Sequence, residues 1–337
     1  MVTNIAVDVG YGRVKAISRG KQLVFPSVLG PWREVRFSNE MTSKSLLEQL
    51  AIEYAGQKMF LGEMAYRQSK ARVNLSMDRF CSVEGLALLF AAIAMLGSGR
   101  DITCNMVTGL PVNAYADQNE KYRQVLLGRH YIKLLKANGV FEERFITIAG
   151  CKVLPQPMGT IFNLILGDDG NLANKELAAS RLAVLDIGAN TIDMCRVDSL
   201  DYIDHESTSY SDLGVFECYR QLSLEIYSTF GIEIPPEEIE PYILNGAIKI
   251  GGRPRSIVDS KNKVYGEAAE KIVSRVRNVW RNMWQMDKIF VTGGGADVFG
   301  EEIVRAFNSP GQVELCRQGT TSNVAGYAKF ANRVWGK

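Results

Sequence analysis

The stretch 181–197, RLAVLDIGANTIDMCRV, has an extended apolar segment on each side of a short turn of small residues. Leu182–Leu185 is a continuous apolar run, and Ile192–Val197 alternates apolar with polar side chains, so the stretch is predicted to form a β-hairpin. Asp186 stands at the mouth of the turn, where a turn leaves backbone N–H groups unpaired. Such amides attract an anion, typically phosphate, and a carboxylate beside phosphate indicates an intervening Mg²⁺ ion. The alternative is an ordinary hairpin, because Asp is common in turns.

The same pattern occurs near the N-terminus, where residues 4–17 read NIAVDVGYGRVKAI. Aligned on their aspartates, the matched positions are Asp8 and Asp186, Gly10 and Gly188, Gly12 and Asn190, Val14 and Ile192, and Lys15 and Asp193. Glycine and asparagine both tolerate positive φ, which accounts for their exchange within the turn. Lys15 can reach back over the turn toward an anion, or it can be a surface lysine. Two equivalent hairpins predict two similar domains that face each other and hold one phosphate chain.

The composition fits a globular protein of two domains or one large one, with 337 residues, 46% hydrophobic and 23% charged. A net charge of +2 gives no electrostatic argument for nucleic acid or a membrane as a direct partner. The six cysteines form no C-x-x-C pair, which argues against zinc and favours reduced thiols in the cytoplasm. The start of the chain does not resemble a signal peptide. The longest apolar run, 86–96, is too short to span a bilayer and predicts a buried helix.

Three further stretches carry candidate chemistry. Gln156 precedes an apolar helix at 161–166, with Pro157 suited to its first turn, so the Gln156 amide can orient a water molecule or act as a polar cap. A strand at 287–292 leads into Gly293–Ala296 and a helix from Asp297. Glycines there let the backbone approach a flat ligand closely, and a helix N-terminus favours phosphate. The basic, glycine-rich stretch 251–260 is predicted to be a solvated loop, with contact to a partner as the alternative.

This ordered set of motifs resembles the actin-like ATPase superfamily over essentially the whole chain, and its details are similar to the plasmid-segregation actins of the ParM/StbA group. The motifs that carry the resemblance are DVGYGRVK at 8–15, FPS at 25–27, TGLP at 108–111, DIGANTID at 186–193, VTGGGA at 291–296 and SNVAGYAKF at 322–330. The resemblance implies an α/β, actin-like (ribonuclease H-like) fold with two duplicated domains around a nucleotide cleft. The first domain would be 1–155, with a subdomain inserted at about 30–75 and completed by a C-terminal helix at 320–337. The second would be 156–319, with a subdomain inserted at about 211–285.

The resemblance also implies a site for ATP or ADP with Mg²⁺. Asp8 and Asp186 would hold the ion through water, and Gln156 would position the attacking water; these three are the catalytic candidates. Tyr11 replaces a small or hydroxyl residue of the family, so its backbone N–H rather than a hydroxyl would serve the phosphate. The residues expected around the nucleotide are Gly10, Tyr11, Gly12 and Lys15 at the first phosphate turn, Gly188, Ala189, Asn190 and Thr191 at the second, Gly214 near the ribose, and Gly293, Gly294, Gly295 and Ala296 at the adenosine.

The function implied is an ATPase that polymerises into cytomotive filaments in the cytoplasm, for segregation of plasmid or other DNA. Its partners would be further copies of itself and a DNA-binding adaptor protein, with no direct contact to nucleic acid or membrane. One alternative is a small-molecule kinase of the sugar or acetate type on the same fold, for which the sequence offers no convincing acid–base residue. Another is a bacterial or archaeal cytoskeletal scaffold with no role in segregation.

Overall fold

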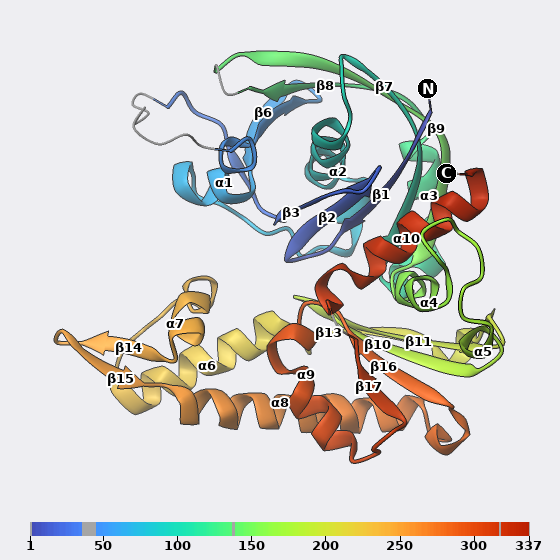
Figure 1. Cartoon of the computed structure of the whole chain (residues 1–337). Helices are drawn as coiled ribbons and strands as arrows, with labels where there is room; N and C mark the ends of the chain where they lie inside the picture. The colour runs from blue at the N-terminus through green and yellow to red at the C-terminus, as the bar shows by residue number, and fades with distance from the viewer. Residues whose placement is uncertain (1, 36–44, 137–138, 317, 337) are drawn as a thin grey trace. The chain divides into compact units, whose positions relative to one another are not determined.

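A computed structural model describes residues 2–35, 45–136, 139–316 and 318–336. Parts of the predicted domain ranges, at positions 1, 36–44, 137–138, 317 and 337, lie outside these residues. The chain divides into two compact units: unit 1 comprises Met1–Lys175 and Thr321–Lys337, and unit 2 comprises Glu176–Thr320. Each unit contains its own β-sheet, so the predicted α/β fold with two sheet domains is confirmed (Figure 1).

The units separate after Lys175, twenty residues beyond the predicted boundary at 155/156. Helix α4 (Met158–Ile165) belongs to unit 1 because it packs on the C-terminal helix α10 (Gly319–Trp335). The rings of Phe162 and Phe330 stack with centroids 4.5 Å apart, and the Thr160 hydroxyl is 2.8 Å from the side-chain oxygen of Asn323. Contacts between segments distant in sequence therefore decide where the first unit ends.

The sheet of unit 1 has nine strands among the described residues, in the order β3-β2-β1-β7-β9-β8-β5-β6-β4. Strands β1, β7 and β9 run parallel to one another, and the other neighbours pair antiparallel. The strands are β1 (Thr3–Val9), β2 (Arg13–Ser18), β3 (Lys21–Pro26), β4 (Leu29–Pro31), β5 (Ala51–Tyr54), β6 (Gln57–Leu61), β7 (Asp101–Leu110), β8 (Gly128–Leu135) and β9 (Phe141–Pro155). Most described strands of the predicted subdomain at 30–75 thus extend this sheet through the β5–β8 pairing.

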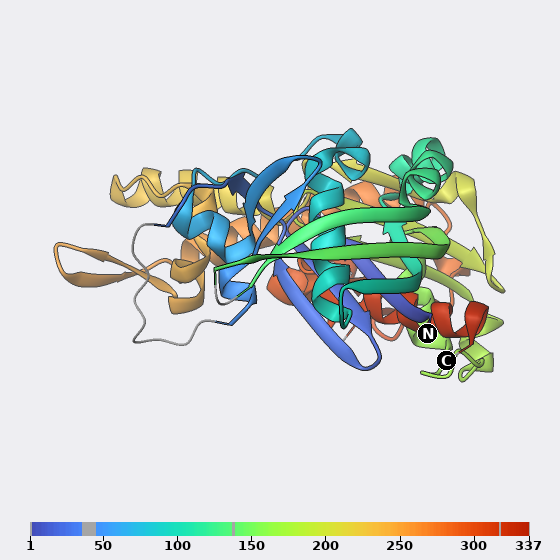
Figure 2. The same cartoon turned by 90° about the horizontal axis from the view of Figure 1, so that it is seen from above.

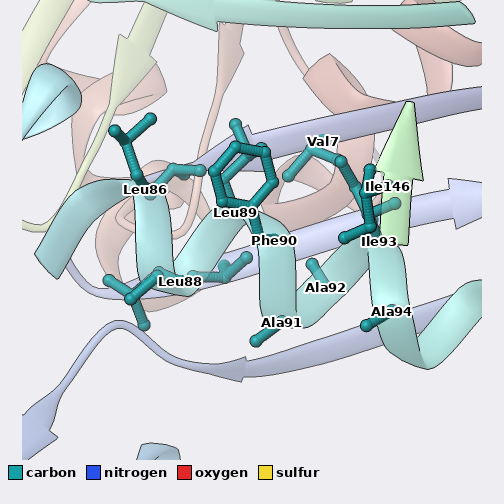
Figure 3. Packing of buried hydrophobic residues seen from close by; sticks show 14 of the residues in the cluster. Val7, Leu86, Leu88, Leu89, Phe90, Ala91, Ala92, Ile93, Ala94 and Ile146 are labelled. Atoms are coloured by element: carbon teal, nitrogen blue, oxygen red, sulfur yellow. The ribbon is translucent and has the colours of Figure 1, made fainter. Parts of the chain in front are cut away.

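Successive side chains of β1 point to opposite faces of the first sheet, and both faces are buried there. Ile5, Val7 and Val9 join the main core with helix α2 (Val83–Leu96), whereas Ala6 lies in a second cluster with Tyr327 of α10. Helix α2 is the buried helix predicted at 86–96. It is apolar on all sides, and the curved sheet surrounds it (Figures 1 and 2). Leu89, Phe90 and Ile93 pack with the strand residues Val7 and Ile146 in this core (Figure 3).

The remaining helices of unit 1 are short or amphipathic. They are η1 (Leu47–Gln49), α1 (Gly62–Gln68), η2 (Met77–Cys81) and α3 (Val112–Leu126). Helix α3 begins at Val112, because Pro111 precedes it as the N-cap residue and the apolar Val112 and Ala114 are buried. Within the described residues, no helix is both long enough and apolar enough to cross a bilayer.

The sheet of unit 2 has six strands among the described residues, in the order β12-β11-β10-β16-β17, and β13 also pairs with β11. Strands β10, β16 and β17 are parallel, and β10 pairs antiparallel with β11. The strands are β10 (Arg181–Ile187), β11 (Thr191–Asp198), β12 (Asp201–Tyr202), β13 (Thr208–Ser211), β16 (Lys288–Thr292) and β17 (Val313–Leu315). An antiparallel hairpin followed by two parallel strands is also the order of β2-β1-β7-β9, so the sheet topology is duplicated.

Helices α6 (Val215–Phe230), α8 (Val258–Val279) and α9 (Ala296–Phe307) share a core with alternate residues of β10 and β11 in unit 2. The shorter elements are α5 (Lys175–Ala178), η3 (Asp204–Glu206), η4 (Pro236–Glu238), α7 (Glu240–Asn245) and η5 (Met283–Gln285). The prediction of a loop at 251–260 is wrong. Strands β14 (Ala247–Ile250) and β15 (Arg253–Ser256) form a hairpin that projects from unit 2 (Figure 2). Gly251 and Gly252 both have positive φ, as a tight two-residue turn requires.

Candidate functional site in each unit

The first hairpin of unit 1 closes through a tight turn between β1 and β2. Asp8 lies directly opposite Lys15 in the strand register, and the N–H of Gly10 donates to the carbonyl of Arg13 at 3.1 Å. A Cβ atom at Gly10 would lie 2.9 Å from that same oxygen, closer than a side chain tolerates. Glycine is therefore required at Gly10 by the closeness of the turn rather than by its φ, which is not positive.

The Asp8 carboxylate forms hydrogen bonds with two other predicted site residues. It is buried, with 2% of its surface exposed. Its Oδ2 accepts from Lys15 Nζ at 2.9 Å, and its Oδ1 accepts from Gln156 Nε2 at 3.1 Å. The structure thus brings together Asp8, Lys15 and Gln156, although Gln156 is 148 positions away in the sequence.

The backbone of Gln156 is held by hydrogen bonds to strand β7 and helix α10. Its backbone N–H donates to the Leu110 carbonyl at 2.8 Å, and its carbonyl accepts from the Tyr327 hydroxyl at 3.2 Å. A Cβ atom at Gly109 would overlap the Tyr327 hydroxyl and come within 3.1 Å of the Gln156 Cγ. The TGLP and NVAGY motifs therefore position Gln156, which lies two residues before the start of α4.

The second hairpin repeats the turn in unit 2. The N–H of Gly188 donates to the Thr191 carbonyl at 2.8 Å, and a Cβ atom at Gly188 would lie 3.0 Å from that oxygen. Within the described part of the chain, the N–H groups of Ala189 and Asn190 donate to no acceptor. The turn therefore presents two free amide donors, as an anion-binding nest does. Asn190 does not adopt positive φ, so tolerance of that conformation is not the reason for its presence.

The carboxylates of the second hairpin differ from those of the first. Asp186 lies directly opposite Asp193, where the first hairpin has a lysine, and both are buried. The hydroxyls of Thr191 and Ser209 donate to the two oxygens of Asp193. Thr191, predicted to bind phosphate, thus uses its hydroxyl to hold Asp193, which leaves only its backbone for a ligand.

The start of helix α6 supports the second turn. The N–H groups of Val215 and Phe216 donate to the carbonyls of Gly188 and Ala189, at 3.1 and 2.8 Å. Gly214 precedes them, and a Cβ atom there would lie 2.5 Å from the Ala189 carbonyl oxygen. Gly214, predicted near the ribose, is therefore a glycine because the helix start contacts the turn backbone.

The Gly293–Gly295 turn packs against the end of β10. Gly293 has φ +89°, and a Cβ atom there would overlap Asp186 Oδ1. A Cβ atom at Gly295 would overlap the Ile187 side chain, whereas the space beside Gly294 is open apart from Thr320 Oγ1 at 3.7 Å. Packing on Asp186 and Ile187 thus requires two of the three glycines, and Ala296 is buried at the start of α9.

Unit 2 also has a hollow between α6 and α8 that the sequence did not predict. It is lined by Leu213, Gly214, Glu217, Cys218, Gln221, Val264, Glu267, Ala268, Lys271 and Ile272. Arg220 and Gln221 donate to Glu217, and these bonds, with burial opposing them, hold the pKa of Glu217 below its usual range. The lining thus combines apolar contact area with a few fixed polar groups. A four-residue spacing on α8 places Glu267 and Lys271 on one helix face. No local feature of the sequence indicates that α6 lies opposite that face.

The surroundings of each aspartate decide whether its carboxylate can hold Mg²⁺. Each oxygen of Asp8 already accepts one hydrogen bond, from Lys15 or Gln156, which leaves a lone pair that can accept a hydrogen bond from a water ligand of the ion. Asp186 is also a buried carboxylate, 7% exposed, and it precedes the turn whose Ala189 and Asn190 amides have no acceptor among the described residues. Carboxylates that contact the ion through water match the preference of Mg²⁺ for retained water ligands. The residues present in each unit therefore fit the ion.

Comparison with known proteins identifies the family. The family model for the N-terminal domain of actin-like proteins matches residues 6–159, and that for the C-terminal part of the archaeal, MreB-like actin homologue matches 184–305. A search of curated proteins found no significant match. Among solved structures, a 15-stranded ParM filament from Clostridium botulinum is 20% identical, with TM-score 0.80 and coverage of 98% of this chain and 99% of that one.

An archaeal actin homologue in complex with ADP is also 20% identical, with TM-score 0.77 over 99% of this chain and 100% of that one. The actin-like protein Alp7A is 17% identical, with TM-score 0.77 over 98% of this chain and 96% of that one. Likeness at this level of identity establishes the fold. The two family models together match most of the chain, so the chain belongs to the actin-like protein family.

Proposed function

We propose that the chain binds and hydrolyses ATP and that it polymerises into filaments in the cytoplasm. The observation that carries this proposal is the repeated hairpin: each unit has a buried aspartate followed by a tight turn that requires glycine. In unit 2, the amides of Ala189 and Asn190 have no acceptor within the described residues. Equivalent anion sites in two duplicated units fit a ligand with a chain of phosphates.

The turn amides of both hairpins and Lys15 would bind the phosphates. Asp8 and Asp186 would hold Mg²⁺ through water, and the bound ion would neutralise phosphate charge. Lys15 and Gln156 already fix the Asp8 oxygens, so the carboxylate is preoriented. Gln156 can orient an attacking water through its amide but cannot take up its proton, so we expect slow turnover.

The adenosine is assigned to residues of unit 2. The Gly293–Ala296 turn and Gly214 are the predicted contacts, and the hollow between α6 and α8 adds apolar and polar groups next to Gly214. Glu217 and Lys271 are the polar side chains there that suit ribose hydroxyls or a base edge. Replacing Lys271 with Ala should weaken binding of adenosine, ADP and ATP by a similar factor, because all three share the nucleoside.

Polymerisation is supported by the relatives, since solved ParM and Alp12 structures of the same fold are filaments. ATP would favour a polymerising conformation, and hydrolysis would weaken the lattice, as a shift between two populations. Head-to-tail contacts that do not close give an open helix. A role in segregating a plasmid or other DNA, through a DNA-binding adaptor, is the finer part of this proposal.

Sedimentation at high protein concentration tests the proposal. The protein should pellet with ATP and Mg²⁺ and should remain in the supernatant with ADP, and phosphate release should follow polymer formation. Absence of any ATP-dependent polymer would refute the filament function. Transfer of phosphate to a sugar or an acid instead of water would indicate a kinase.

A further inference from the structure

In both turns, the two backbone carbonyls that follow the aspartate accept hydrogen bonds, but the donors differ between the units. In unit 2, the Ile187 carbonyl accepts from Gly295 N–H at 2.8 Å, and the Gly188 carbonyl accepts from Val215 N–H at 3.1 Å. Both donors are neutral backbone amides from the starts of α9 and α6. These bonds fix the carbonyls of the turn, and its Ala189 and Asn190 amides, which have no acceptor among the described residues, stay available to an anion.

The equivalent carbonyls in unit 1 are those of Val9 and Gly10, and a single side chain holds both. The Nη2 atom of Arg79, in η2, donates to Val9 O and to Gly10 O at 2.7 Å each. Its Nη1 atom donates to the Asn74 carbonyl at 3.1 Å. The guanidinium therefore replaces two backbone amides and ties the turn to a segment about 65 residues farther along the chain.

Arg79 is built into the core of unit 1. Arg79 is only 2% exposed. Its guanidinium carbon lies 4.3 Å from the Tyr11 ring centroid and 5.1 Å from that of Phe80. The Phe80 ring contacts the fully buried Tyr122 edge-on, with centroids 6.0 Å apart. These contacts explain why the first turn has a tyrosine where a small residue was expected: the Tyr11 ring covers the guanidinium.

The Arg79 cation has no carboxylate as a direct partner in the part of the chain that the structure describes. Among the described residues Arg79 forms no ion pair, and its Nε atom has no hydrogen-bond partner. Burial lowers its pKa to about 10, so the group still carries its proton at neutral pH. The nearby Asp8 is already paired with Lys15. A positive charge without an ion pair among the described residues therefore lies directly behind the first turn.

We infer that Arg79 is the positioning residue of the first phosphate turn and that its buried charge strengthens binding of the anionic phosphates. This inference rests on the proposed nucleotide function. The guanidinium fixes the carbonyls of Val9 and Gly10, as backbone amides do in unit 2, and adds a charge that unit 2 lacks at this place. It does not touch the ligand, and it acts through the turn.

The test compares the Arg79→Gln and Arg79→Lys variants with the wild type. Calorimetric titration with MgADP, MgATP and adenosine should show MgADP and MgATP binding about 10- to 100-fold weaker in Arg79→Gln, the size expected for hydrogen bonds to a charged group. Adenosine affinity should not change, because it carries no phosphate. Arg79→Lys should lose about tenfold in MgADP affinity, since one ammonium cannot span carbonyls of two segments.

Amide hydrogen exchange provides a readout that needs no nucleotide. In Arg79→Gln the amides of Gly10 and its neighbours in the turn should exchange faster, while those of the second turn around Gly188 should not change. Arg144→Gln is the control, because Arg144 is a half-buried arginine of unit 1 whose buried Nε also has no hydrogen-bond partner among the described residues, and it lies on β9, paired with Glu142. That control should leave both affinity and turn exchange unchanged.

The outcomes separate the inference from the proposed function. A folded Arg79→Gln variant with wild-type affinity for MgADP and wild-type turn exchange would overturn the inference. If Arg79→Gln does not fold, Arg79→Lys decides, and wild-type MgADP affinity in that variant would overturn it equally. Equal losses for adenosine and MgADP would also overturn it, because general loosening of the site is not a phosphate effect. A wild-type protein that binds neither ATP nor ADP would refute the proposed function instead.

Discussion

Replacing Gly326 with alanine should destabilise unit 1, although the same change elsewhere should stabilise a helix. Gly326 lies within α10, where it faces α4. A Cβ atom there would overlap the carbonyl oxygen of Gly159 and lie 2.6 Å from Gly159 C and 2.7 Å from Asn163 N. All three obstacles are backbone atoms, so no side chain can rotate away, and the two helices must move apart.

The magnitude follows from two opposing contributions. Alanine is favoured over glycine in a helix interior by about 1 kcal/mol. Overpacking costs about 1–3 kcal/mol, and the upper end applies because separation of α4 from α10 also loosens the Phe162–Phe330 stack. The net loss in free energy of unfolding should be about 2 kcal/mol, which lowers the melting temperature of unit 1 by about 4–8 °C.

The matched control is Gly266→Ala in α8. Gly266 also lies inside a long helix, but a Cβ atom there meets no atom within 4 Å. This variant should gain about 1 kcal/mol, so the two substitutions should shift stability in opposite directions. Thermal and urea unfolding followed by circular dichroism measure both. Equal stability of Gly326→Ala and wild type would refute the reasoning.

Gly326→Ala should also slow ATP turnover, if the proposed function holds. Tyr327 is the next residue, and its hydroxyl donates to the Gln156 carbonyl. A displaced α10 therefore moves the support of Gln156. Unchanged turnover in a destabilised variant would show that Gln156 does not depend on this contact.

Three other outcomes are expected. Asp186→Ala should abolish Mg²⁺-dependent ATP turnover while the circular dichroism spectrum stays that of the wild type; full turnover would place the reaction elsewhere. Gln156→Ala should slow turnover, spare nucleotide binding and cost about 1.5–3 kcal/mol of stability through the lost bond to the Asp8 carboxylate; loss of binding in calorimetry would contradict its role. Burial raises the pKa of Cys104 from 9.0 to about 12, so its neutral thiol contributes stability that is complete below pH 9 and is lost as the pH rises toward 12. Urea unfolding at pH 8 and 10.5 should therefore show a smaller alkaline loss in Cys104→Ala, and an identical loss in both proteins would contradict this.

Sequence alone was sufficient for the local elements of both candidate sites. The two Asp–Gly hairpins, the buried helix α2 and the strand before Gly293 each follow from alternation, small-residue turns or a continuous apolar run. Those signals are local because backbone geometry repeats every two residues in a strand and every 3.6 in a helix. The double-glycine turn at 251–252 was also a local signal for the β14–β15 hairpin, and a weak strand pattern on either side concealed it.

The tertiary structure decided which distant residues meet. Gln156 contacts Asp8, Arg79 holds the first turn, and α4 joins unit 1 through α10, although at least 69 positions separate the members of the first two pairs. No spacing rule connects such residues, because their contacts arise only when the sheet and the helices pack. The sequence by itself thus determined the turns and their aspartates. Packing determined what holds each turn in place: a buried cation in unit 1 and backbone amides at the starts of α6 and α9 in unit 2.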